Sequence, residues 1–197
     1  MIRSPLRAGL ALACALSLSA CGGGKGDLYI SGAAFGVTKA GLILTNNGGD
    51  DLAVNTAGSF VFSKPVETDA GYKVEVKAVP SNVEKKEDCV VINGSGKAVF
   101  NVTTVQVVCK IRSHALGGTI IGLNGATDLV LVNGTDRKEI VPAASATQSF
   151  AMNPVSEDSA YGVSILQQPK GRNCTVENAS GIMLANDISN IVVRCTQ

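Results

Sequence analysis

Cysteine and histidine are the residue types in this chain with the most usable chemistry, and the chain contains six cysteines and one histidine. Cys14 and Cys21 lie in the N-terminal region. The other four are Cys89, Cys109, Cys174 and Cys195. A nucleophile needs a base and a zinc site needs several ligands, so a single histidine, His114, argues against both. We therefore expect paired cysteines to be structural, and His114 to be a solvated connector residue.

Cys21 follows Leu18-Ser19-Ala20 at the end of an apolar run. Arg3 and Arg7 precede the run, and a basic segment followed by a short apolar one is typical of a secretory signal peptide. One branched and two small residues before a cysteine resemble the lipobox of bacterial lipoproteins. The resemblance implies that residues 1–20 are a signal peptide and that Cys21 becomes the lipid-bearing N-terminus. The alternative is a plain signal peptide with an incidental cysteine.

A lipid attached to Cys21 implies that the protein is located in the bacterial cell envelope. Residues 21–27 are glycine-rich and predict a lipidated flexible tether. Gly22 stands where an inner-membrane retention signal often has aspartate, so by resemblance to sorting rules we expect the outer membrane. Removal of residues 1–20 takes two arginines from 17 basic and 16 acidic residues and leaves a net charge of −1. That charge gives no electrostatic reason to expect nucleic acid as a partner.

The rest of the chain contains one unit twice. Tyr72 and Pro80 recur as Tyr161 and Pro169 with the same spacing, and two cysteines follow each proline. A period of roughly 86 residues is too long for a solenoid and fits a duplicated small domain. We place the units at 28–110 and 115–197, joined by a connector at 111–114.

Both units have the pattern of β-strands. Tyr72, Val74 and Val76 alternate with polar residues, as in a half-buried strand. Asn-Gly pairs, which favour hairpin turns, lie at 47–48, 93–94, 124–125 and 133–134. About seven short strands per unit with frequent turns predict a β-sandwich. The expected fold class is all-β, with two tandem small β-sandwich domains after a lipoprotein signal peptide.

A few positions in each unit resemble a known sandwich family. The order Phe60-x-Phe62, Gly71-Tyr72-x-Val74 and Pro80 resembles transthyretin-like and carboxypeptidase regulatory-like sandwiches. The second copy differs, with Met152 and Ala160 for the second Phe and the Gly. The tandem arrangement is also similar to repeats of bacterial envelope lipoproteins. Neither resemblance supplies catalytic residues.

Repeat symmetry predicts the disulfides. Four cysteines allow three pairings, and each copy contains two cysteines at nearly the same separation. We therefore pair Cys89 with Cys109 and Cys174 with Cys195. Closing a loop of about 20 residues stabilises a domain by roughly 3 kcal/mol in the chain-entropy model.

The acidic residues fall mainly at predicted turns, where we expect solvated charges. They are Asp50, Asp51, Glu67, Asp69, Glu84, Glu87, Asp88, Asp136, Glu157 and Asp158. Segment 46–51 is rich in oxygen ligands but lacks the spacing of a calcium loop, so we expect a hairpin turn there. Segment 84–88 is an insertion relative to the second copy, and we interpret it as a solvated loop or a partner contact.

These observations favour a non-enzymatic binding or structural module anchored in the bacterial cell envelope. We expect no cofactor, no metal and no catalytic residue, and as partners the membrane, through the lipid, and an unidentified envelope or extracellular macromolecule. One alternative is a hydrolase that uses loop carboxylates, which would need two carboxyl groups across a cleft. Another is an accessory factor for the assembly of a secreted polymer.

Overall fold

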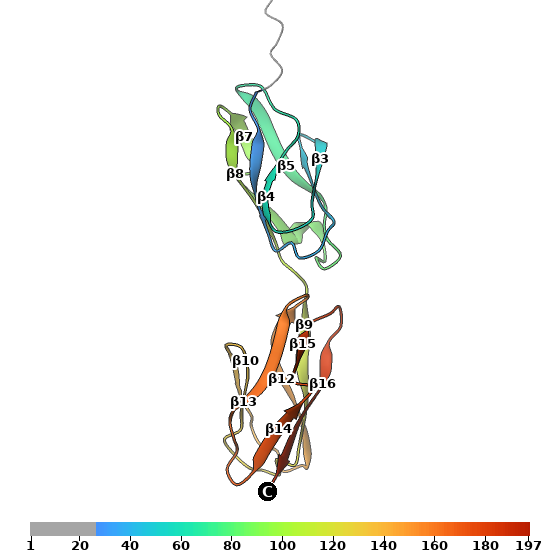
Figure 1. Cartoon of the computed structure of the whole chain (residues 1–197), viewed down its shortest axis with the longest axis vertical. Coiled ribbons are helices and arrows are strands. Elements are labelled where there is room, and N and C mark those ends of the chain that lie inside the picture. The colour runs from blue at the N-terminus through green and yellow to red at the C-terminus, as the bar shows by residue number, and fades with distance from the viewer. Residues whose placement is uncertain (1–26) are drawn as a thin grey trace, which may run out of the picture.

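The computed structural model describes residues 27–197, which fold into two β-sandwich halves placed end to end (Figure 1). The signal peptide and Cys21 lie outside the described residues. Within this range the only helical element is the short 3₁₀ helix η1 (Lys86–Asp88). No helix in 27–197 has the length and apolar character needed to cross a membrane.

The first half has eight strands. They are β1 (Ile30–Phe35), β2 (Leu42–Asn46), β3 (Gly49–Val54), β4 (Gly58–Val61), β5 (Ala70–Ala78), β6 (Cys89–Ile92), β7 (Ser95–Ala98) and β8 (Val102–Cys109). One sheet has the order β4-β1-β8-β6 and the other the order β3-β2-β5-β7. Strands β1 and β8 are parallel, and the other neighbours are antiparallel.

The second half repeats this topology. Its strands are β9 (Ser113–Ile121), β10 (Val130–Asn133), β11 (Asp136–Glu139), β12 (Thr147–Ser156), β13 (Ala160–Gln167), β14 (Asn173–Glu177), β15 (Ser180–Ile182) and β16 (Ile188–Thr196). The sheets have the orders β12-β9-β16-β14 and β11-β10-β13-β15, so each strand has a counterpart at the same place in the first half. The predicted duplication is therefore also a duplication of topology. Ser113 and His114, expected in the connector, are the first residues of β9.

Glycine makes the parallel strand pair possible in both halves. A Cβ at Gly32 would lie 1.9 Å from the Val105 carbonyl oxygen, and a Cβ at Gly118 would lie 1.9 Å from the Ile191 carbonyl oxygen. Only a residue without a side chain allows the backbones to approach this closely.

Each half has its own core and its own disulfide. The first core is built around Phe62 and the second around Leu116, and no buried residue is shared between them. The disulfides Cys89–Cys109 and Cys174–Cys195 join directly opposed residues of neighbouring antiparallel strands. Both pairings predicted from repeat symmetry are present.

The strand faces agree with the alternating pattern, because Tyr72 and Val74 are buried while Lys73 and Glu75 are not. The hairpin prediction holds only in part. Asn47-Gly48 and Asn133-Gly134 lie at the β2–β3 and β10–β11 hairpins. Asn93-Gly94 instead connects β6 to β7, which belong to opposite sheets, and Asn124-Gly125 lies in the loop after β9. Positive φ favours Asn-Gly in any tight turn, not only in a hairpin.

Candidate functional site

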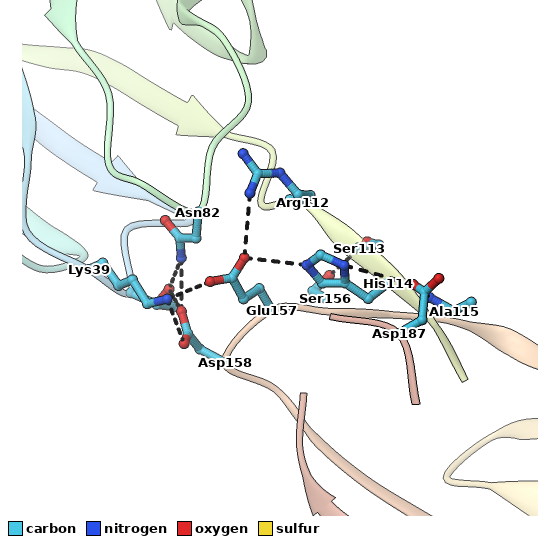
Figure 2. A network of polar contacts seen from close by, with 11 residues as sticks. Lys39, Asn82, Arg112, Ser113, His114, Ala115, Ser156, Glu157, Asp158 and Asp187 are labelled. Carbon is cyan, nitrogen blue, oxygen red and sulfur yellow. Dashed lines mark hydrogen bonds and ion pairs between the residues drawn. The ribbon is translucent and has the colours of Figure 1, made fainter. Parts of the chain in front are cut away.

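A cluster of charged and polar side chains lies between the two halves (Figure 2). The first half contributes Thr38 and Lys39 from the β1–β2 loop and Asn82 from the β5–β6 loop. The second half contributes Glu157 and Asp158 from the β12–β13 turn. Because loop ends of both sandwiches meet here, residues far apart in the sequence become neighbours. We call this set, together with Arg112 and His114, the junction cluster.

Glu157 is the centre of the junction cluster. Its side chain is only 3% exposed, and Oε1 accepts a hydrogen bond from Lys39 Nζ at 2.5 Å. Oε2 lies 3.4 Å from His114 Nε2 and 4.0 Å from Arg112 Nη1. The hydrogen bond from Lys39 outweighs burial and holds the pKa of Glu157 below its ordinary value. Glu157 is therefore an ionised, paired carboxylate near neutral pH.

Asp158 ties the same turn to a second loop of the first half. Its Oδ2 accepts hydrogen bonds from Thr38 Oγ1 and from Asn82 Nδ2, both at 2.9 Å. Burial opposes ionisation of Asp158, but hydrogen bonds from Thr38, Lys39 and Asn82 prevail and lower its pKa. Asn82 is fully buried and also donates to Thr38 Oγ1 at 2.6 Å. With both contacts on Nδ2, the orientation of the amide is fixed.

The connector backbone is held on both sides. The Arg112 N–H donates to the Asn82 carbonyl at 2.8 Å, and the Arg112 carbonyl accepts from the Glu157 N–H at 2.8 Å. Two residues before Arg112, the Lys110 N–H donates to the Asp88 carbonyl at 2.7 Å. These bonds attach the short segment between β8 and β9 to loops of both halves, which limits bending there.

The expectation that His114, Glu157 and Asp158 are solvated residues is wrong. The side chain of His114 is only 11% exposed, and the two carboxylates are hydrogen-bonded across the junction. The sequence contained one usable signal, because the equivalents of His114 and Glu157 in the first copy are Leu28 and Thr68. His114 and Glu157, which have no charged counterpart in the first copy, take part in the contact between the halves.

Carboxylates that could serve a hydrolase lie at the far end of the second half. Asp128 and Glu139 line a cavity of about 310 Å³, together with Arg137. Lys170 Nζ lies 2.9 Å from Asp128 Oδ2, and Arg137 Nη1 lies 2.6 Å from Glu139 Oε1. The hydrogen bond from Lys170 lowers the pKa of Asp128. A general acid needs a raised pKa, which Asp128, Glu157 and Asp158 do not have.

The candidate cation segment 46–51 uses its oxygens for internal contacts. Asn46 Oδ1 accepts from the Lys73 N–H, Asp50 accepts from Ser63 and from the Lys64 N–H, and Asp51 pairs with Lys77. In residues 27–197, no three His, Cys, Asp or Glu side chains are grouped so that they could hold a metal ion.

The two halves differ in the outer face of one sheet. In the first half, Phe35, Val108 and Val90 are exposed and stand in one row across β1, β8 and β6. The same row in the second half contains Arg194 and Thr175 beside Ile121. The first half is therefore the more apolar of the two on this face.

Comparisons with known proteins show no family and yield only distant structural likeness. No protein-family model matches the chain, and no curated protein matches it. Among solved structures, the chain is similar to a mutant of the shaft pilin spaA from Lactobacillus rhamnosus GG. The two are 10% identical, the match covers 87% of this chain and 99% of that chain, and the TM-score is 0.30. At that TM-score the function has to be argued from the chain's own geometry.

Proposed function

We propose that this protein is an envelope lipoprotein that acts as a rigid, non-enzymatic spacer. Cys21 carries the lipid at the outer membrane, and the two sandwiches hold the far end of the second half away from the bilayer. The loops at that end are then available to an envelope or extracellular macromolecule. The observation that carries the proposal is the junction cluster, which is built to fix two domains relative to one another.

Stiffness follows from the number and kind of bonds that bending would break. Rotation of one half would separate Lys39 from Glu157 and Asn82 from Asp158. It would also break at least one of the two backbone hydrogen bonds of Arg112, because one joins Arg112 to the first half and the other joins it to the second. Hydrogen bonds to charged groups are about twice as strong as neutral ones, and separation of the halves would replace the contact between Lys39 and Glu157 by contacts with water.

The same geometry argues against placing the hydrolase alternative in the junction cluster. Its carboxylates are satisfied by cations and amides, and their pKa values are lowered. A spacer needs such closed ion pairs, whereas a catalytic pair needs one carboxyl that retains its proton near neutral pH.

Small-angle X-ray scattering on the soluble fragment 22–197 tests the spacer. We expect the wild-type fragment to scatter as one elongated particle, and Glu157→Ala to give a wider distribution of shapes. Glu177→Ala is the matched control, because Glu177 forms an exposed ion pair with Arg194 inside the second half. If Glu157→Ala leaves the scattering unchanged, the junction cluster does not hold the halves and the spacer proposal is wrong.

The anchor has its own test. Cys21→Ser is expected to abolish metabolic labelling with a radioactive fatty acid and to leave the precursor uncleaved or released from membranes. Separation of inner and outer membranes then locates the wild-type protein. Continued partition of Cys21→Ser into the membrane fraction would contradict the lipid anchor.

A further inference from the structure

The segment before β1 and the β7–β8 turn lie at the end of the first half that is farthest from the second half (Figure 1). These two segments contain three large exposed apolar side chains. Tyr29, Val99 and Phe100 are 45%, 52% and 81% exposed. The Tyr29 N–H donates to Asn101 Oδ1 at 2.8 Å, and the Tyr29 carbonyl accepts from the Val102 N–H at 2.9 Å. These bonds fix the segment before β1 beside the β7–β8 turn. We call Tyr29, Val99 and Phe100 the apolar tip.

The second half has the same local structure without the aromatic residues. There the Ala115 N–H donates to Asp187 Oδ1 at 2.8 Å, which matches the bond from Tyr29 to Asn101. Ala115 therefore stands in the place of Tyr29. Asn186, which precedes Asp187, stands in the place of Phe100. The fold therefore does not require aromatic residues at the places of Tyr29 and Phe100, although the place of Val99 is taken by another exposed apolar residue, Leu184.

The two equivalent ends face different neighbours. In the second half this end meets the first half, and it does so through polar residues such as His114 and Glu157. In the first half the corresponding positions are Leu28 and Thr68, and this is the end at which the chain arrives from Cys21. The junction end of the second half presents His114 and Glu157 together with the exposed Leu184, whereas the end nearest the anchor presents the exposed aromatic residues Tyr29 and Phe100.

We infer that the apolar tip rests in the interfacial region of the lipid bilayer. Only Gly22–Gly26 separate Cys21 from Asp27, and a trans chain of that length reaches at most about 20 Å. Tyrosine favours the membrane–water interface, because the interface accommodates both its apolar ring and its hydroxyl group, and the purely apolar Phe100 and Val99 would be buried at the boundary with the acyl chains. This inference rests on the proposed lipid anchor.

Charge does not account for this placement. The same end carries both signs, from Asp27, Lys64, Glu67, Asp69 and Lys97. Apolar burial in the bilayer surface is therefore the attraction that the geometry supports. Together with the rigid junction cluster, a second contact beside the acyl chains would fix the direction in which the second half points.

Tryptophan fluorescence tests the inference, since the natural chain contains no tryptophan. Phe100→Trp places one reporter in the apolar tip, and Val141→Trp places the control reporter at the far end of the second half, where Val141 is 85% exposed. Each full-length lipidated protein is reconstituted into vesicles of phosphatidylethanolamine and phosphatidylglycerol, with and without brominated acyl chains. We expect Phe100→Trp to show blue-shifted emission and strong loss of fluorescence to the brominated lipid, and Val141→Trp to show neither.

The flotation and quenching results distinguish failure of the membrane contact at the apolar tip from failure of the lipid anchor. If both variants float with the vesicles and neither is quenched, the protein is anchored but the tip stays in water or contacts another copy, and the inference is wrong. Equal quenching of both reporters would mean that the molecule lies flat, which also contradicts it. If intact mass shows no acyl chains and the protein does not float, the anchor itself fails and the inference fails with it. Unchanged melting temperatures of both variants establish that the fold is intact.

Discussion

At the scale of single residues, the glycines of the parallel strand pair make the sharpest steric prediction. A Cβ at Gly118 would lie 1.9 Å from the Ile191 carbonyl oxygen, whereas a Cβ at Gly162 would meet nothing within 4 Å. Overpacking typically costs about 1–3 kcal/mol, so we expect Gly118→Ala to lower the free energy of unfolding of the second half by at least that much. Gly162→Ala is the control and should change it by less than about 1 kcal/mol. Urea titration of both variants measures the difference, and equal stability would contradict the close approach of β9 and β16.

The charges of the junction cluster predict how its strength depends on pH. The pKa values of Glu157 and Asp158 are lowered, so their contribution is present above their ordinary values of 4.5 and 3.8 and is lost as the pH falls through the lower folded values. The pKa of Lys39 is raised by Glu157, so its contribution is full below 10.5 and is lost as the pH rises above that value. We expect the scattering profile to widen as the pH falls below the ordinary pKa values of the two carboxylates. Glu157→Gln should weaken this acid response, and an identical response in that variant would contradict the assignment.

Among the secondary-structure elements, each disulfide links two neighbouring strands of one half covalently. Cys174–Cys195 joins β14 to β16, and Cys89–Cys109 joins β6 to β8. Replacing Cys174 and Cys195 by alanine should destabilise the second half by about 3 kcal/mol. The first half should melt as before, because the two cores share no residue. Calorimetry of the double variant, with the Cys89 and Cys109 double variant as its mirror control, tests this. Equal loss of stability in both halves would mean that they fold as one unit.

At the scale of the whole molecule, the structure combines independent cores with a polar junction. Fragments 27–112 and 113–197 should therefore each fold alone, since each retains a core and a disulfide. In the intact chain, the less stable half should melt at a higher temperature than its isolated fragment, because the junction cluster adds bonds that the fragment lacks. Glu157→Ala should reduce that difference. Failure of both fragments to fold would contradict the two-core architecture.

The all-β fold class, the duplication and the disulfide pairing of this protein could all be predicted from the amino-acid sequence. Strand faces follow from alternation along a few neighbouring residues such as Tyr72, Lys73 and Val74, so a local pattern suffices. The disulfide pairs follow because a duplicated unit must be satisfied within each copy. Turn residues such as Asn93 predict that the chain changes direction. They do not predict whether the next strand joins the same sheet or the opposite one, because positive φ does not specify this.

The contacts between the two copies could not be predicted from the sequence, because they join residues that are far apart along the chain. Lys39 and Glu157 are 118 positions apart, and Asn82 and Asp158 are 76 apart. No local pattern relates residues so distant, and a charge at a turn has the same appearance in the sequence whether it is solvated or buried. Whether Glu157 faces water or a lysine depends on how the two sandwiches abut. A charge in a loop is buried only if another part of the chain covers it. Which part covers it depends on the three-dimensional arrangement and not on the residues beside it in the sequence.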